Sequence, residues 1–500
     1  MEKIKKMRGK LFLVGLLIAV FTVAVFSSGA IFAPKNFQDI YNRIGKYIML
    51  VPGKFSGTVA AVDLSTGKTL AWISFWNYGD YTPITHHIAA FPSEDPYKGF
   101  EYIINTQGGK NLYIYGIPTK VKDPAAGFHI YRVKYDGTKM NLIEDVAETT
   151  GLGLGVHVTI SEDAKKFAVG DGQKDIIGVF DRETSKVDAA IFYDWEPNIK
   201  NVKEAWSGGG KLIVKKISPD PKTGKYDLQG LKGLKLDWEL VPGGENFLVE
   251  GKVTGPRAIN SVGVDALLFD PRGRWAVTAL RVVGASVIHD KTNNYEPVGV
   301  MYSYRGKITV GKLNKVDKDT WEIDIPKVEN YAHQAGFSPD GKHFLLMGAI
   351  MENAIYVWDS SDHSNPMNWK QKTAVTKPEW RGAYPQTFHM GFTPDSKKVY
   401  VTLWWPSPTP NGYAVVDAVN WKVIKEVEIG PDQHTLQVTY DGKHMTGVFS
   451  AYQKTQSGIF IVDVKTDKLI GFLPNTAGSH DHVIVPRTLK DLRISRSPTT

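Results

Sequence analysis

Short apolar runs separated by turns dominate the chain from Val51 onward, and no long amphipathic helix interrupts them. In the segment from Asn330 to Gly348, one apolar run leads into an Asp-Gly turn and a second apolar run follows it, which predicts a β-hairpin. Similar turns recur along the chain. Their sequences are Ser161-Glu-Asp-Ala, Asp270-Pro-Arg-Gly, Ser338-Pro-Asp-Gly, Thr393-Pro-Asp-Ser and Tyr440-Asp-Gly.

A second kind of hairpin lies between these turns and begins with an apolar residue followed by aspartate. It occurs at Val62-Asp63, Phe180-Asp181, Val416-Asp417 and Val462-Asp463. Two alternating hairpins are typical of the four-stranded blade of a β-propeller. We therefore predict an all-β fold, a single seven-bladed β-propeller in residues 51–500, with a short N-terminal helical segment in the lead-in of residues 31–50. The stretches 198–235 and 361–380 are interpreted as insertions in the earlier blades.

A histidine precedes four of the turns by six or seven residues. The four are His157, His333, His389 and His434. The innermost strand of each propeller blade lines the central channel, so a residue at this distance from the turn lies near the start of that strand. A single histidine there commonly caps a strand end. Four at one repeated position predict a ring of imidazoles that face one another across the axis.

Two more histidine pairs and one carboxylate suit the same ring. The pairs are His86 with His87, and His480 with His482. Asp265 lies five residues before its own turn and takes the histidine position in its blade. A buried carboxylate among imidazoles is costly unless it binds a metal ion or a proton, although an Asx turn would also account for an aspartate there.

The N-terminal residues indicate export. Five basic side chains and Glu2 precede an uncharged, largely apolar run from Leu11 to Ala30, which is typical of an export signal, or of an uncleaved N-terminal anchor. Residues 1–30 thus carry net +4 of the formal charge of +8, and no basic stripe indicates nucleic-acid binding. We expect a protein of the periplasm or the cell exterior. The chain has no cysteine, which excludes disulfides and every thiolate metal site.

The number of imidazoles indicates how many metal ions, and of which kind, the site could bind. Six or seven imidazoles and a carboxylate are too many ligands for one tetrahedral zinc ion, but they suit a cluster of two to four imidazole-bound ions. Among the divalent ions that imidazole binds, copper has the highest affinity. We therefore expect a copper site.

These residues resemble those of the thiocyanate dehydrogenase family and, more distantly, the propeller domain of nitrous oxide reductase, over roughly Val51 to Arg487. The matching phrases are Pro52-Gly-Lys54-Phe-Ser-Gly, His86-His87, Gly155-Val-His157, Asp237-Trp-Glu239, Val264-Asp265, Tyr331-Ala-His333, Thr387-Phe-His389, Asp432-Gln-His434 and Ser479-His480-Asp481. The resemblance implies about three copper ions. It implies as their ligands His86, His157, Asp265, His333, His389, His434 and His480. His87 and His482 are less certain candidates, since Asp481 directly after His480 makes His480 the better match than His482.

The resemblance also implies an activity, the two-electron oxidation of thiocyanate by water to cyanate and sulfur. The electrons would pass to an external acceptor such as a cytochrome c. Lys54 would offer a positive charge to the anionic substrate, and Glu239 would accept a proton. Without the resemblance, Lys54 is a solvated turn charge and Glu239 a surface carboxylate. Because nitrous oxide reductase has a cysteine-bound dicopper centre in a further domain, the lack of cysteine argues against nitrous oxide reduction here.

Other functions fit the same residues. A related copper propeller enzyme could act on another small anion or gas, and a non-enzymatic propeller could bind or deliver metal. A zinc hydrolase would use the same histidines with Glu239 as its base. A homodimer is compatible with these patterns.

Overall fold

The computed structural model describes the chain from Ile44 to Ser495 with gaps. The described residues are 44–54, 56–78, 83–107, 111–114, 117–119, 128–172, 174–197, 209–228, 231, 248–249, 252–253, 262–281, 283–302, 309–325, 331–349, 352–381, 386–404, 412–429, 433–449, 457–475 and 479–495. The predicted export signal, Glu239 and all but the end of the predicted lead-in helix lie outside them. Within them, no helix is long and apolar enough to span a bilayer.

In this described part, seven antiparallel sheets have four or more strands, and we number them 1 to 7 in chain order. Sheet 1 has the order β3 (Lys68–Ser74), β2 (Thr58–Asp63), β1 (Ile48–Gly53) and β36 (Val483–Ile484). Sheet 2 has β4 (Ile84–Ala90), β5 (Phe100–Gln107), β8 (Phe128–Tyr135) and β9 (Met140–Asp145). Sheet 3 has β10 (Val158–Ile160), β11 (Lys166–Asp171), β12 (Ile176–Asp181), β13 (Val187–Pro197), β14 (Gly210–Ile217), β23 (Thr320–Ile325) and β22 (Asn314–Lys315).

The remaining large sheets follow the same pattern. Sheet 4 has β17 (Val264–Phe269), β18 (Trp275–Leu280), β19 (Ala285–Asp290), β20 (Glu296–Tyr302) and β21 (Thr309–Lys312). Sheet 5 has β24 (Tyr331–Phe337), β25 (His343–Ala349), β26 (Glu352–Asp359) and β27 (Lys370–Arg381). Sheet 6 has β28 (Gln386–Phe392), β29 (Lys398–Trp404), β30 (Gly412–Asp417) and β31 (Lys422–Glu428). Sheet 7 has β32 (Gln433–Val438), β33 (His444–Phe449), β34 (Ser457–Asp463) and β35 (Lys468–Asn475).

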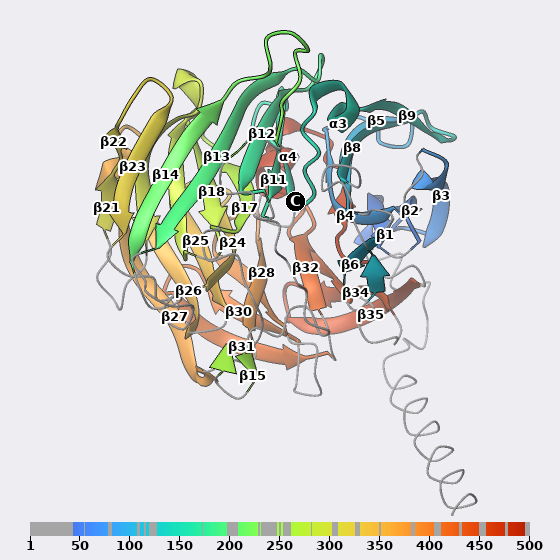
Figure 1. Ribbon diagram of the computed structural model, residues 1–500. Helices are drawn as coiled ribbons and strands as arrows, with labels where there is room; N and C mark the ends of the chain where they lie inside the picture. The colour runs from blue at the N-terminus through green and yellow to red at the C-terminus, as the bar shows by residue number, and fades with distance from the viewer. Residues whose placement is uncertain are drawn as a thin grey trace, which may run out of the picture.

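The other described elements are small. Two sheets have two strands each, β6 (Asn111–Ile114) with β7 (Ile117–Thr119) and β15 (Leu248–Val249) with β16 (Lys252–Val253). The helices are α3 (Val146–Thr150), α4 (Leu489–Ser495) and the 3₁₀ turns η1 (Phe75–Asn77), η3 (Lys291–Asn293) and η4 (Pro366–Asn368). Figure 1 shows the large sheets arranged around a common centre, with β4, β17, β28 and β32 toward the middle and β3, β27 and β35 at the rim. The prediction of an all-β propeller is confirmed.

Local turn chemistry explains the inner hairpins. Ser161 donates a hydrogen bond to the Asp163 carboxylate at 2.6 Å and accepts one from the backbone N–H of Lys166 at 2.8 Å, which closes the turn between β10 and β11. A hydroxyl and an aspartate two residues later form the same pair after β24, β28 and β32. Such local hydrogen bonds need no distant partner, which is why the turns could be predicted from the sequence.

Two features differ from the sequence interpretation. The propeller begins at Ile48, before the expected boundary at residue 51, because Met49 and Leu50 already pair with the C-terminal strand β36. The stretches 198–235 and 361–380 are not wholly insertions. Residues 210–217 form β14, which extends sheet 3, and residues 370–381 form β27, the outermost strand of sheet 5.

Strand β36 closes the ring of sheets. It is the innermost strand of sheet 1, although it comes from the C-terminal end of the described chain and its partner β1 from the other end. Tyr440 of the neighbouring sheet 7 donates its hydroxyl to the Ile484 carbonyl, and the Gln437 side chain accepts from the Ile484 N–H at 2.7 Å. The short strand is therefore held from both sides, and His480 lies just before it.

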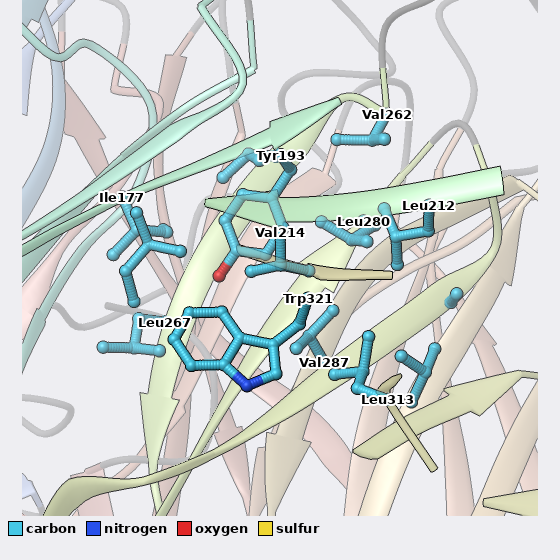
Figure 2. Close-up of a cluster of buried hydrophobic side chains, with 14 of the residues drawn as sticks. Ile177, Tyr193, Leu212, Val214, Val262, Leu267, Leu280, Val287, Leu313 and Trp321 are labelled. Atoms are coloured by element: carbon cyan, nitrogen blue, oxygen red, sulfur yellow. The ribbon is translucent and has the colours of Figure 1, made fainter. Parts of the chain in front are cut away.

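Apolar side chains fill the spaces between neighbouring sheets. In the cluster of Figure 2, Ile177 and Tyr193 of sheet 3 lie near Leu267 and Val287 of sheet 4, and Trp321 packs among them. All of these side chains are buried. Because this core is made of sheet-to-sheet contacts, the ends of the innermost strands are left for other chemistry.

Candidate metal centre

The innermost strands bring most of the predicted ligands to one place. His86 and His87 lie on β4, Asp265 on β17, His389 on β28 and His434 on β32. His157 directly precedes β10, and His480 precedes β36. We call the six residues His86, His87, His157, His389, His434 and His480 the imidazole cluster. All six are buried.

The ring-to-ring distances show how closely these imidazoles lie. Centroids are 3.6 Å apart for His434 and His480, 3.8 Å for His87 and His157, 4.2 Å for His389 and His434, and 4.4 Å for His86 and His480. His87 is near the middle, because its ring also lies 5.2 Å from His480 and 6.3 Å from His434. The ligand atoms of His86, His87 and His480 all lie within 4.8 Å of one another, a spacing that can hold one metal ion.

A β-bulge occurs at each ligand position on an innermost strand. In β4, Thr85 pairs with Thr106 and Ile88 with Ile104, so two residues, His86 and His87, face one residue of β5. The same two-against-one shift occurs in β17, β24, β28 and β32. The unpaired residues there are Asp265 and Ala266, His333 and Gln334, Phe388 and His389, and His434 and Thr435.

The same geometry occurs before β10. Val156 donates its N–H to the Gly170 carbonyl at 2.8 Å, and Gly170 donates its own N–H to the His157 carbonyl at 3.0 Å, so two residues again face one. A bulge breaks the regular ladder and changes the direction of a side chain. Its repetition in these strands shows that the backbone is shaped at the ligand positions.

In sheets 2 and 6, the strand next to the innermost strand supplies polar side chains that hydrogen-bond to backbone groups left unpaired by the bulges. Asn105 accepts from the N–H of His87 at 2.9 Å and donates to the Val156 carbonyl at 2.5 Å. Thr402 accepts from the N–H of His389 at 2.7 Å. A buried N–H without such a partner costs about 1–3 kcal/mol, so Asn105 and Thr402 stabilise the bulges.

Three imidazoles have a defined partner at Nδ1. His86 donates to the Val156 carbonyl at 3.3 Å, and His87 donates to Oδ2 of Asp481 at 3.1 Å. His480 accepts at Nδ1 from the Lys54 ammonium at 3.1 Å, since an ammonium group can only donate. The proton of His480 is then on Nε2, so a metal ion would bind this residue at Nδ1, in place of the Lys54 hydrogen bond. Lys54 itself is fully buried in the turn after β1, so the solvated-charge interpretation of this residue is wrong.

Asp265 is bound by a cation. Arg281, which directly follows β18, donates from Nε to Oδ1 of Asp265 at 2.6 Å, and its Nη2 contacts the same oxygen. Nε2 of His157 lies 3.4 Å from that oxygen. Arg281 is partly exposed, whereas Asp265 is fully buried. The carboxylate therefore joins the imidazole cluster to a positive charge at the edge of the site.

Burial dominates the protonation of these groups. It lowers the pKa values of His86, His87, His157 and His480 well below the ordinary 6.5, and neighbouring positive groups such as Lys54 and Arg281 lower them further. Burial raises the pKa of Asp265 to about 6, and Arg281 opposes that shift. These four imidazoles are consequently neutral at pH 7, which is the form that binds a metal ion.

The donor set fits a metal of the kind that imidazole binds. Nε2 of His87 and Oδ2 of Asp265 are buried and have no hydrogen-bond partner among the described residues. A native structure seldom leaves such buried atoms unsatisfied without a functional reason. Neutral imidazole nitrogens with one carboxylate oxygen are ligands suited to copper, zinc, iron or nickel.

Of the predicted residues, His482 lies apart from the cluster, and the side chains of two others lie outside the described part. His482 points into a different environment, with Nδ1 3.0 Å from the Thr435 hydroxyl and Nε2 2.8 Å from the Thr446 hydroxyl. His333 lies on β24 at the bulge of that strand, but its side chain is outside the described part, as is all of Glu239. His87, the less certain candidate, lies nearest the middle.

Sequence reasoning missed several supporting residues. Arg281 and Asp481 had no assigned role. Gly170 lies where an added Cβ would be 2.3 Å from the Asp265 carbonyl oxygen, so only glycine lets the His157 and Asp265 segments approach. Asp175 accepts from the N–H groups of Val262 and Gly263 just before β17. In β4, β24 and β32, a pair of polar residues at the start of an apolar inner strand is the local feature that could have indicated the bulge.

The fold and the site together define a β-propeller with a buried imidazole cluster at the ends of its innermost strands. The sequence matches no protein-family model and no curated protein. Among solved structures, the chain is similar to a functionally unknown protein from Desulfotomaculum acetoxidans, with 8% identity and a TM-score of 0.48 over 88% of this chain and 100% of that chain.

It is also similar to the dihydro-heme d1 dehydrogenase NirN, with 13% identity and a TM-score of 0.46 over 91% of this chain and 78% of that chain. Hydrazine synthase of Kuenenia stuttgartiensis has 13% identity and a TM-score of 0.40 over 65% of this chain and 67% of that chain. At these identities and scores the similarities carry no argument about the chemistry of the site.

Proposed function

We propose that the protein is an exported copper-dependent oxidoreductase that oxidises thiocyanate. The observation that supports this best is the convergence of six buried, closely spaced imidazoles with Asp265 and Lys54. Neutral imidazoles and one carboxylate supply ligands for more than one ion, and a buried ammonium group in the same cluster suits an anionic substrate. The resemblance to thiocyanate dehydrogenase suggests about three copper ions and this substrate.

The reaction balances with one water. Thiocyanate and water give cyanate, elemental sulfur, two protons and two electrons, so the carbon–sulfur bond breaks and a carbon–oxygen bond forms. Copper, when bound, accepts electrons one at a time and polarises a small ligand. The two electrons leave to an external acceptor, for which we propose an exported redox protein such as a cytochrome c.

The chain's own residues have separate roles in this proposal. The imidazole cluster and Asp265 hold the ions, together with His333 by the same repeat. Lys54 lies within the cluster, because its Nζ is 3.1 Å from His480 Nδ1, and its charge would hold the anion next to the ligands. Glu239 would accept a proton during the attack of water, as the resemblance suggests.

We also propose that each of the seven sheets with four or more strands is one blade. The support is that six of them start from an innermost strand with a site residue, and the seventh contributes β36 behind His480.

Metal analysis and a redox assay test the function. The purified protein, loaded with Cu(II) and dialysed, should retain more than one copper ion per chain and show a paramagnetic signal. Thiocyanate should then reduce an added artificial acceptor, with cyanate as product. Retention of zinc alone would refute the redox proposal, and copper binding without acceptor reduction by thiocyanate would refute the substrate.

Lys54→Met gives a sharper test of the substrate site. The change removes the charge and keeps the apolar part of the side chain, so KM for thiocyanate should rise at least tenfold. Because Lys54 also donates to Nδ1 of His480, copper content is measured in parallel and KM is compared at full copper loading. Lys98→Met is a matched control, because Lys98 is exposed and its ammonium pairs with Asp95 at 3.1 Å, a surface carboxylate outside the cluster. An unchanged KM in Lys54→Met would remove Lys54 from substrate binding.

A further inference from the structure

Asp481 is a fully buried carboxylate beside the imidazole cluster that has no part in the ligand set. Its Oδ2 accepts hydrogen bonds from Nδ1–H of His87 at 3.1 Å and from the N–H of Ile88 at 3.1 Å. Its Oδ1 accepts from the N–H of His482 at 2.8 Å. The Thr435 hydroxyl also bonds to this carboxylate.

These four donors determine the orientation of the carboxylate. Asp481 lies between His480 and His482, directly before the closing strand β36, while His87 and Ile88 belong to β4 of the next sheet. Two backbone N–H groups, one from each side, hold the carboxylate in place. Because the carboxylate is held in place, its Oδ2 determines the orientation of the His87 imidazole.

The consequence for His87 is a defined tautomer. A neutral imidazole has one N–H and one lone pair. Because Nδ1 of His87 faces a carboxylate, the proton is on Nδ1 and the lone pair is on Nε2. Nε2 has no hydrogen-bond partner among the described residues, and the His87 ring lies 3.8 Å from the His157 ring and 5.2 Å from the His480 ring.

We propose that Asp481 is a positioning residue, which makes His87 a metal ligand by holding its Nδ1–H and presenting Nε2 to the imidazole cluster. The inference rests on the proposed metal site and assigns to it a supporting carboxylate from the segment before the closing strand β36. Carboxylates that hold the second nitrogen of a ligating histidine typically change metal affinity by about 10- to 100-fold. Because Asp481 precedes the strand β36 that closes the ring of sheets, pairing of β36 with β1 also brings this carboxylate to His87.

Asp481→Asn tests this on the full-length protein. Asparagine has one acceptor oxygen, so its NH₂ group must face either the His87 and Ile88 donors or the His482 N–H. Cu(II) is titrated against a competing chelator, and the copper EPR spectrum is recorded. We expect one ion to bind about 10- to 100-fold more weakly, with a changed nitrogen hyperfine pattern.

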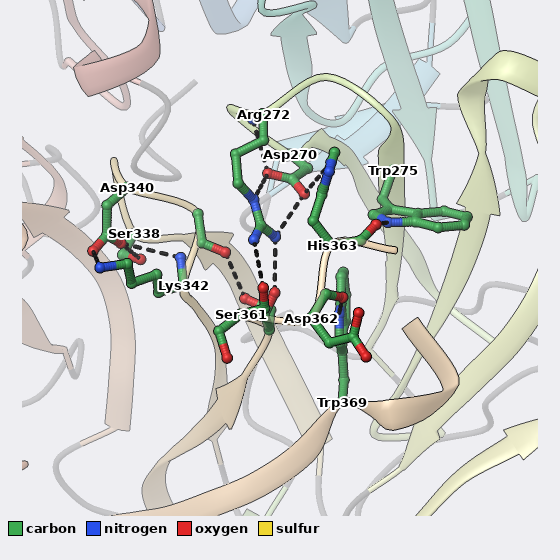
Figure 3. A network of polar contacts seen from close by, with 12 residues as sticks. Asp270, Arg272, Trp275, Ser338, Asp340, Lys342, Ser361, Asp362, His363 and Trp369 are labelled. Atoms are coloured by element: carbon green, nitrogen blue, oxygen red, sulfur yellow. Dashed lines mark hydrogen bonds and ion pairs between the residues drawn. The ribbon is translucent and has the colours of Figure 1, made fainter. Parts of the chain in front are cut away.

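Asp270→Asn is the matched control. Asp270 is equally buried and accepts from Arg272 at 2.9 Å, within the polar network of Figure 3. It directly follows the end of β17, whereas Asp265 lies at the start of that strand. This variant loses a buried carboxylate without touching an imidazole of the cluster. Its copper affinity and EPR spectrum should match those of the wild type.

The outcomes separate the two proposals. If the wild type binds copper and Asp481→Asn gives the same affinity and spectrum, the role of Asp481 is refuted and the proposed function stands. If the wild type binds no copper, the proposed function fails. Should Asp481→Asn not fold, ¹⁵N NMR of the metal-free wild type decides, with His87→Asn used to assign the signal. A proton on Nδ1 of His87 supports the inference, and a proton on Nε2 overturns it.

Discussion

Acidification should unfold the metal-free protein unusually steeply, because many histidines are buried in the neutral form. Besides that of the partly exposed His343, burial lowers the pKa of six buried histidines. They are His86, His87, His157, His289, His480 and His482, with values of about 3 for His289 and about 4 for His482. In the unfolded chain each has its ordinary pKa of 6.5. The unfolded state therefore binds more protons below that value, and stability falls as the pH falls.

The magnitude follows from proton linkage. Between about pH 7.5 and about pH 5.5, one such histidine costs the folded state about 1.4 kcal/mol, and the six together cost about 8 kcal/mol. Two carboxyl groups act in the opposite direction, because burial raises the pKa of Asp265 to about 6 and that of Asp481 to about 7. They bind protons in the folded state over this range, which stabilises the folded state by about 3 kcal/mol. The net loss is about 5 kcal/mol, a large part of the stability of an ordinary domain.

Urea unfolding of the chelator-treated protein at the two pH values measures this loss, provided that the m-value stays constant. In His482→Asn one titrating group is missing, so the loss should shrink by about 1.4 kcal/mol. A total loss below about 2 kcal/mol would refute the reasoning, because the buried imidazoles would then take up protons without unfolding. An unchanged loss in His482→Asn would exclude that residue from the effect.

Five further substitutions each test a single residue. Arg281→Met should destabilise the metal-free protein by about 3 kcal/mol in urea unfolding, because Asp265 stays buried without its cation. Gly170→Ala should cost about 1–3 kcal/mol and lower copper affinity, since the new Cβ meets the Asp265 carbonyl; wild-type affinity would contradict this. His157→Ala should lose part of the copper while circular dichroism shows the fold retained. Glu239→Gln should keep copper but lower turnover by about 10²- to 10⁴-fold, whereas Asp265→Asn should lose copper; equal copper loss in both would make Glu239 a ligand.

Much of the fold could be predicted because its determinants are local. The pair Ser161 and Asp163 closes its own turn with hydrogen bonds over a few residues, and the equivalent pairs after β24, β28 and β32 do the same. The strand boundaries missed at Ile48 and Lys370 depend instead on distant partners. Ile48–Leu50 is a strand because β2 and β36 pair with it, and Lys370–Arg381 because β26 does.

The site was predictable to the extent that the propeller repeats. His157, His389 and His434 have one phase relative to their turns, and equivalent positions in a ring of sheets meet near its axis. Within the pairs His86/His87 and His480/His482, the sequence did not show which histidines lie in the imidazole cluster. His87 and not His482 approaches the other imidazoles, because a bulge in β4 and the Thr435 and Thr446 hydroxyls direct the two rings differently.

The sequence by itself determined the all-β architecture, the turns and the positions at which imidazoles recur, since each depends on residues a few positions apart. Only the tertiary structure decided which groups support the ligands. Asp481 reaches His87 across 394 positions, and Lys54 reaches His480 across 426. Arg281 meets Asp265 only because β18 pairs with β17 around a bulge. Such contacts arise when the closing strand and the shifted ladders bring distant backbone together, and no local pattern of residues encodes them.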